Sequence, residues 1–218
     1  MAYGVKMKIW GDRACFTRPE MKAERVSYDV MTPSAARAAV EAIYWKPSIR
    51  WIIDKIHVLN PIRFDNIRRN ELSEKLSVRT VTSAMHDSAK SVEILIEDKR
   101  QQRAAMVLRD TAYIIEAHFE AIDKNGTNEG KHLDIFNRRL EKGQCFYQPY
   151  LGTREFSAYF EKPDNIPKSQ LKGERDLGWM LFDLDFTDKN NPKPLFFRPK
   201  MFDGVISVPH PDSEEVIR

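Results

Sequence analysis

A segment in the middle of the chain, Ala112–Ile122, alternates between apolar and polar side chains. Its apolar members at every second position are Tyr113, Ile115, Ala117, Phe119 and Ala121, and the polar residues between them are Glu116, His118 and Glu120. Successive side chains of a β-strand point to opposite faces of its sheet, so this pattern predicts a strand with one buried face. Tyr3–Trp10 has the same period, with Lys6 and Lys8 between apolar residues, and predicts a second strand of this kind.

Start and stop signals predict two helices. Thr32–Pro33 is typical of a helix start, and the alanine-rich run that continues to Tyr44 is ended by Lys46–Pro47, because the residue before a proline is disfavoured in a helix. Asn128–Lys142 predicts the second helix, with Asn128 as its N-cap and Gly143 as its stop. The buried stripe predicted for this second helix, at spacings of three and four, consists of Leu133, Phe136 and Leu140.

Three further segments complete the expected pattern. Ser48–Leu59 is rich in Ile, Val and Trp and predicts a strand with a bulge near Asp54. Gln144–Leu151 predicts another short strand. Between residues 61 and 111 we expect charged loops, with a short helix at Asn70–Leu76 and a strand at Ser91–Glu97.

In chain order, residues 3–150 give strand, helix, strand, insertion, strand, helix and strand. This order is typical of the split βαβ arrangement of ferredoxin-like or RRM-like domains. Beyond it, Leu177–Phe186 alternates again and indicates further β-structure. We therefore predict an α+β protein with a ferredoxin-like domain at 1–150, an insertion at about 61–111, and a small mostly-β domain at 151–218.

Composition excludes several other classes. The chain has 218 residues, of which 42% are hydrophobic, 31% charged and 11% aromatic, so a disordered chain is excluded. No run approaches the length of a transmembrane helix, and the N-terminus lacks the apolar segment of a signal peptide, so we expect no membrane partner. The two cysteines are too few for a disulfide framework, and a reducing cytoplasm is the expected compartment.

Charge is unevenly distributed along the chain. The formal net charge is +3, which excludes a histone-like polycation. Residues 1–111 contain 20 basic and 14 acidic side chains, whereas residues 112–218 contain 15 and 18. The N-terminal half is therefore where contact with a polyanion is expected.

Common cofactor and metal motifs are missing from the sequence. The five histidines and two cysteines show no zinc-ligand spacing, so we expect no metal site. The sequence has no phosphate loop, no dinucleotide fingerprint and no nucleophile elbow, and we expect no cofactor. We interpret His118 as an exposed sheet histidine beside carboxylates.

Lys131 and His132 fall in the first turn of the second predicted helix, where free N–H groups and the helix dipole favour an anion. A lysine is unusual there, and a bound phosphate would explain it. The dipole and Lys131 both disfavour imidazolium, so His132 should stay neutral and able to act as a base. The alternative is a solvated, charged helix start with His132 packing locally.

Tyr44 and Trp45 lie where the first predicted helix ends. An aromatic pair at this position is commonly part of the core. In the split βαβ arrangement, however, the two helices lie side by side on one face of the sheet, so their ends can bring Tyr44 near Lys131 and His132.

Five sequence blocks, in order and at fitting spacing, resemble the CRISPR-associated "Cas five" family of the type I-C system (subtype c or d). They are Gly11–Pro19, Ile43–Pro47, Glu116–Glu120, Asn128–His132 and Leu151–Glu155. The resemblance spans roughly residues 3–160. It implies an endoribonuclease that cuts the repeat of precursor CRISPR RNA at the base of its hairpin. It also implies that the protein stays on the 5′ handle as a subunit of a surveillance complex, beside the backbone and large subunits.

The family's catalytic Tyr, Lys and His match Tyr44, Lys131 and His132. RNA supplies its own nucleophile, the 2′-OH, so this resemblance implies a metal-independent reaction that yields a 2′,3′-cyclic phosphate and a 5′-hydroxyl. We assign proton transfer to His132, stabilisation of phosphate charge to Lys131, and positioning or deprotonation of the 2′-OH to Tyr44; which of Tyr44 and His132 is the base stays open. The basic side chains expected to hold RNA are Arg13, Arg18, Lys22, Arg25, Lys46, Arg63, Arg68 and Arg69.

Two alternatives remain from the sequence. One is a non-catalytic scaffold that only binds the 5′ handle, although such a scaffold need not keep Tyr44, Lys131 and His132. The other is a metal-dependent nuclease, which the lack of clustered carboxylates in the sequence disfavours.

Overall fold

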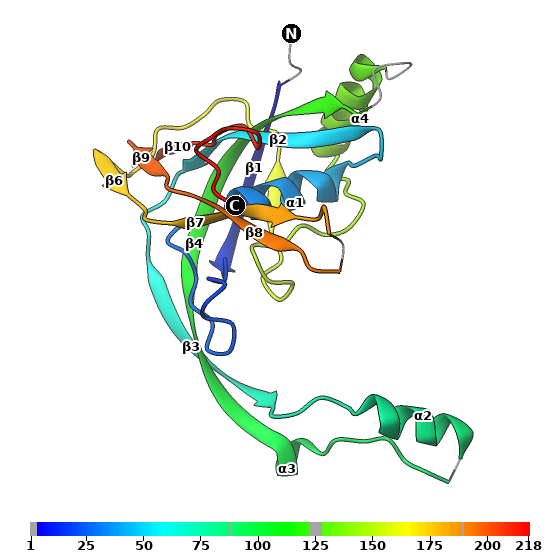
Figure 1. The fold of residues 1–218 in the computed structure, drawn as a ribbon. Coiled ribbons are helices and arrows are strands. Elements are labelled where there is room, and N and C mark those ends of the chain that lie inside the picture. The colour runs from blue at the N-terminus through cyan, green and yellow to red at the C-terminus, as the bar shows by residue number, and fades with distance from the viewer. Residues whose placement is uncertain (1–3, 88, 123–127, 189) are drawn as a thin grey trace. The chain divides into compact units, whose positions relative to one another are not determined.

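An antiparallel sheet forms the centre of the fold (Figure 1). The computed structural model describes residues 4–87, 89–122, 128–188 and 190–218. The central strands follow the order β5 (Tyr159–Glu161), β1 (Gly4–Ala14), β4 (Arg100–Ala121) and β2 (Ile49–Val58), and each neighbouring pair is antiparallel. The chain is therefore an α+β protein. The two strands predicted from alternation, around residues 3–10 and 112–122, are the adjacent strands β1 and β4, although Tyr3 lies outside the described residues.

Strand register explains why one face of the sheet is buried. Met7 of β1 pairs with Ile115 of β4, and both are buried, as are Trp51 and its partner Phe119. Lys6 and Glu116 also pair, but on the opposite face. The predicted bulge in β2 is confirmed, since its register with β4 shifts between Ile53 and Lys55.

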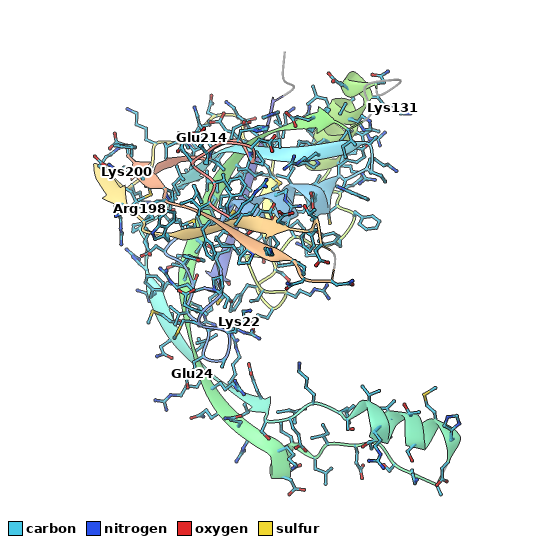
Figure 2. The ribbon with its side chains drawn as sticks, viewed as in Figure 1. Lys22, Glu24, Lys131, Arg198, Lys200 and Glu214 are labelled. Atoms are coloured by element: carbon cyan, nitrogen blue, oxygen red, sulfur yellow. The ribbon has the colours of Figure 1, made fainter. Side chains whose placement is uncertain are left out.

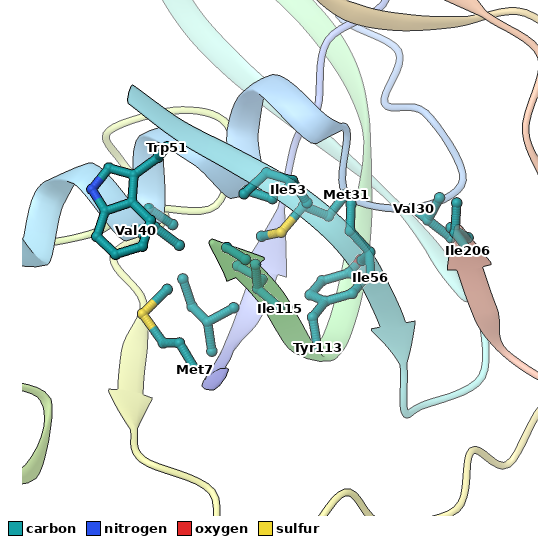
Figure 3. Close-up of a cluster of buried hydrophobic side chains, with 14 of the residues drawn as sticks. Met7, Val30, Met31, Val40, Trp51, Ile53, Ile56, Tyr113, Ile115 and Ile206 are labelled. Atoms are coloured by element: carbon teal, nitrogen blue, oxygen red, sulfur yellow. The ribbon is translucent and has the colours of Figure 1, made fainter. Parts of the chain in front are cut away.

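Helices α1 (Pro33–Ile43) and α4 (Glu129–Glu141) contact each other, and both begin where predicted. Thr32 caps α1 by accepting a hydrogen bond from the Ala35 amide, and Asn128 caps α4 in the same way. Figure 3 shows Val40 of α1 in the same cluster of buried side chains as Met7, Trp51 and Ile115. Phe136 of α4 packs against the Trp51 ring, with 5.0 Å between the ring centroids.

The region between residues 61 and 111 differs from expectation. The predicted helix at Asn70–Leu76 is wrong, because strand β3 (Phe64–Leu72) runs into its start and the rest is bend and coil. The predicted strand at Ser91–Glu97 is also wrong, because coil leads there into the short helix α3 (Ile96–Lys99). The strand predicted at 112–122 begins much earlier, at Arg100. Its first half carries no apolar alternation, and pairing with β3 makes it a strand.

Residues 66–105 form a compact unit by themselves, and residues 1–65 and 106–218 form the other. The smaller unit contains helix α2 (Val78–His86) and α3, neither of which buries a residue. Its strands are joined beyond the ladder by the Ser73 amide, which donates to the Lys99 carbonyl at 2.9 Å, and by an ion pair between Lys99 and Glu74. This unit is held by backbone pairing and surface charge, with little apolar burial.

The strand predicted at Gln144–Leu151 is wrong. The amides of Phe146 and Tyr147 both donate to the Ala42 carbonyl at the end of α1, which binds this segment to a helix end instead of a strand. The next strand is β5, which pairs with β1 at Lys8–Trp10.

The C-terminal strands are short, and part of them extends the central sheet. β10 (Val205–Ser207) pairs with β2, followed by β9 (Lys200–Phe202) and β6 (Glu174–Asp176). β7 (Met180–Asp185) and β8 (Lys193–Phe197) form a separate two-stranded sheet. None of the helices in the described residues is long and apolar enough to cross a membrane.

Candidate active site

Tyr44 lies at the end of α1, in extended backbone conformation at φ −155° and ψ 125°. The helix stops there because Pro47 follows closely, and the Trp51 indole fixes the turn by donating to the Tyr44 carbonyl at 2.8 Å. The Tyr44 side chain is buried. Burial raises the pKa of the phenol, and the positive charge of Arg139 opposes that rise.

Lys131 and His132 lie in the first turn of α4. The Asn128 side chain accepts a hydrogen bond from the Lys131 amide at 3.0 Å, which sets the direction of the turn. Lys131 is exposed at this helix start, as Figure 2 shows, whereas His132 is half-buried. The Phe119 ring of β4 meets the His132 ring edge to face, with 6.0 Å between centroids. His132 is thus held between the sheet and its own helix.

The structure brings Tyr44 and His132 into direct contact. The Tyr44 hydroxyl and His132 Nδ1 are 2.8 Å apart, and the ring centroids are 5.8 Å apart. With Tyr44 as donor, the bond selects the neutral imidazole that carries its proton on Nε2. A proton can therefore pass between the two side chains, which come from the end of one helix and the start of another.

An open cleft of about 640 Å³ lies over this pair. Its lining residues are Tyr44, Lys46, Pro47, Ser48, Asn128, Lys131, His132 and Ile135. Burial, and then the charges of Lys131 and Lys46, lower the pKa of His132, so the ring is neutral at pH 7. Two cations and the N-terminus of α4 make the cleft suited to a phosphate group.

The three predicted catalytic residues and Lys46 therefore line one cleft. The other residues predicted to hold RNA are not among its lining residues. Arg13, Arg18 and Arg25 each form an ion pair, with Asp65, Asp29 and Glu155 respectively. Lys22 (Figure 2), Arg63 and Arg68 are exposed and Arg69 is half-buried, with Arg68 and Arg69 in the 66–105 unit. Binding of RNA by these eight residues stays a prediction.

His118 differs in part from its interpretation. It lies on β4 and contacts a carboxylate, as expected, but the carboxylate is that of Asp54 in β2, 2.8 Å from Nδ1. The side chain is 17% exposed, so it is half-buried and not exposed. The bulge in β2 at Asp54 brings these two residues together.

Sequence reasoning missed Arg139. Its guanidinium lies over the Tyr44 ring, 5.3 Å from the centroid. Arg139 follows His132 by seven residues, close to two helical turns, so the spacing itself placed it on the face that carries His132.

Comparisons with known proteins show the family of this chain. The Cas5d family model, described as CRISPR-associated protein (Cas_Cas5), matches residues 4–209. The chain belongs to this family. Its sequence is 55% identical over 227 residues to the CRISPR pre-crRNA endoribonuclease Cas5d of Mannheimia succiniciproducens, covering 100% of both chains. It is 40% identical over 232 residues to the protein of the same name from Thermus thermophilus, covering 98% of this chain and 95% of that one.

Solved structures share the fold. A structure titled "Crystal Structure of CRISPR-associated Protein" superposes with a TM-score of 0.69 at 24% identity and 100% coverage of both chains. The functionally uncharacterized protein SMU1763c from Streptococcus mutans gives 0.68 at 24% identity, covering 100% of this chain and 98% of that one. A chain of a CRISPR RNA-guided surveillance complex gives 0.50 at 13% identity, with coverages of 95% and 90%.

Proposed function

We propose that this Cas5 family protein is an endoribonuclease that cleaves precursor CRISPR RNA within the repeat, at the base of the hairpin. The observation that carries the proposal is the bond between the Tyr44 hydroxyl and His132 in a cleft with Lys46 and Lys131. Two relatives of almost the same length, 55% and 40% identical, are named pre-crRNA endoribonucleases, which supports the substrate class.

The chemistry needs three tasks. The 2′-OH loses its proton as its oxygen forms a bond to phosphorus, the phosphorane carries extra negative charge, and the bond to the 5′-oxygen breaks while that oxygen gains a proton. Neutral His132 and the Tyr44 hydroxyl bonded to it move the protons. Lys131 and the first amides of α4 stabilise the phosphorane. The products are a 2′,3′-cyclic phosphate and a 5′-hydroxyl, and no step requires a metal ion.

After cleavage, we propose, the protein stays on the 5′ handle of the mature CRISPR RNA as a subunit of the type I-C surveillance complex, in contact with its backbone and large subunits.

The fold proposal is that the core is a ferredoxin-like split βαβ domain within residues 1–150, followed by a small mostly-β domain at 151–218. The strand order β5-β1-β4-β2 supports the split βαβ arrangement, because it places the strands of two βαβ units alternately, although the fourth strand, β5 (Tyr159–Glu161), lies beyond residue 150.

A cleavage assay in EDTA tests the reaction. We expect the purified protein to cut a repeat hairpin RNA in the presence of EDTA. The same RNA with a single 2′-deoxynucleotide at the scissile position should stay intact. His132→Ala should bind the hairpin and not cut it. Loss of cutting in EDTA, or cutting of the deoxy substrate, would refute the mechanism; binding by the unmodified protein without any cutting would indicate the non-catalytic scaffold.

A further inference from the structure

The end of α1 is bonded to three other parts of the chain at three consecutive carbonyls. The Ala42 carbonyl accepts from the Phe146 amide at 2.8 Å, the Ile43 carbonyl from Arg139 Nη1 at 2.7 Å, and the Tyr44 carbonyl from the Trp51 indole at 2.8 Å. The last carbonyls of a helix have no partner within it, so these bonds satisfy them. They also fix the backbone on which Tyr44 stands.

One of those bonds comes from the helix that carries His132. Arg139 is in the last turn of α4, and His132 is in the first. Phe136 lies between them on the same face and anchors the helix by packing on Trp51. The Tyr44 side chain therefore contacts one face of α4 at two places, with its hydroxyl at His132 and its ring at Arg139.

We propose that Arg139 is a positioning residue for Tyr44, which joins the last carbonyl of α1 to α4 and holds the phenol ring so that its hydroxyl meets His132. The proposal rests on the function proposed above. It adds a residue that touches the backbone beside Tyr44 and the face of its ring, and that is not among the residues lining the cleft. A guanidinium suits both contacts, because it donates in a plane and stacks on an aromatic ring.

The charge of Arg139 has a second effect. Among the charged groups of the described residues, Arg139 favours the phenolate of Tyr44, whereas Lys131 and Lys46 act on His132. Trp51 and Phe146 bring no charge to the Tyr44 backbone. Loss of the guanidinium should therefore raise the pKa of Tyr44 further and leave that of His132 in place.

Arg138 supplies a matched control. It is next to Arg139 in the last turn of α4 but is exposed. Arg138→Gln and Arg139→Gln remove the same charge from the same helical turn. Arg139→Lys keeps the charge and loses the planar donor group. The measurements are single-turnover cleavage of the repeat hairpin RNA, and titration of the Tyr44 ring by NMR of 13C-labelled tyrosine, assigned with Tyr44→Phe.

For Arg139→Gln we expect cleavage to fall about tenfold or more and the Tyr44 pKa to rise. Arg139→Lys should leave the Tyr44 pKa close to that of the unmodified protein and should cleave faster than Arg139→Gln. Arg138→Gln should match the unmodified protein in both measurements. Equal rates for the two Gln variants would overturn the proposal, and so would an unchanged Tyr44 titration in Arg139→Gln. If the unmodified protein cuts no RNA, the proposed function fails, yet the titration still decides whether Arg139 controls Tyr44.

Discussion

The Tyr44 hydroxyl contacts His132 across two helices, and the rest of the tyrosine is held by its ring and its backbone. Tyr44→Phe therefore removes one oxygen and keeps the buried ring. We expect single-turnover cleavage to fall about 100-fold, because the His132 Nδ1 loses the group with which it exchanges a proton. The free energy of unfolding should fall by only about 1 kcal/mol, the usual contribution of one hydrogen bond.

Tyr147→Phe is the control for that variant. The Tyr147 hydroxyl donates to the Ala38 carbonyl at 3.4 Å, and Tyr147 is not one of the residues that line the cleft. Loss of this hydroxyl should therefore leave cleavage unchanged. Cleavage by Tyr44→Phe at the rate of the Tyr147 variant would contradict the assigned role.

His132 must be neutral to accept a proton, so cleavage should increase as pH rises through its pKa, which burial, Lys131 and Lys46 place below the usual 6.5. Lys46→Gln removes one of the positive charges that disfavour imidazolium. The pKa of His132 then rises, and the acidic limb of the single-turnover profile at saturating RNA should move to higher pH.

Lys142→Gln gives the comparison for net charge, because Lys142 is exposed at the other end of α4. An acidic limb that stays in place in the Lys46 variant, or that moves equally in the Lys142 variant, would refute this account of the His132 pKa.

At the scale of elements, the predicted strands and helices were confirmed where local chemistry and burial agree. Ala112–Ile122 has both the alternation of a strand and a buried face in the sheet, and Thr32 and Asn128 form the caps that their residue types favour. These elements place Tyr44, Lys131 and His132, so much of the candidate site could be predicted from helix ends and a family resemblance.

Pairing between distant segments explains the errors. Arg100–Ala105 became a strand through its partner β3, without an apolar pattern of its own, and Gln144–Leu151 bonded to the end of α1 although its composition favours a strand. Arg139 was missed for a similar reason. Its contact with Tyr44 depends on how α4 packs against α1, which no local pattern specifies.

The loop after residue 150 depends on Gly152, and this dependence can be tested. Gly152 has φ +85°, and a Cβ there would lie 2.0 Å from the carbonyl oxygen of Cys15, the residue after β1. The neighbouring Leu151 carbonyl accepts from the Cys15 amide at 3.0 Å, so the loop cannot move away without losing that bond. We expect Gly152→Ala to lower the free energy of unfolding by about 2–4 kcal/mol in urea denaturation.

Gly143→Ala is the control that separates the cost of a positive φ from the cost of a steric clash of the new Cβ. Gly143 also has positive φ, +61°, but a Cβ there would meet nothing within 4 Å. Its cost should be about 1 kcal/mol, from backbone conformation alone. Equal costs for the two variants would show that the approach of the loop to Cys15 does not matter.

For the whole molecule, both ends of the chain build one sheet. Strand β1 and the C-terminal strands β10, β9 and β6 belong to it, and the helices that carry the site pack on its buried face. The hydrophobic cluster takes its buried residues from the larger compact unit and none from residues 66–105. We therefore expect residues 66–105 to contribute to RNA binding, through Arg68 and Arg69, without contributing much to the stability of the larger unit.

Replacement of residues 66–105 by a short Asn-Gly turn tests that separation. The Arg109 amide donates to the Arg63 carbonyl at 3.0 Å, so the two ends to be joined already lie on paired strands. Because the removed unit contributes nothing to the central cluster, we expect the shortened protein to fold cooperatively, with a melting temperature within about 5 °C of the original.

Arg68 and Arg69 are removed with the unit, so the affinity for repeat hairpin RNA should fall and the dependence of that affinity on salt concentration should weaken. In the matched full-length variant with Arg68→Gln and Arg69→Gln, the same loss of salt dependence would assign the effect to these two charges. An unfolded shortened protein would show that the smaller unit supports the sheet after all.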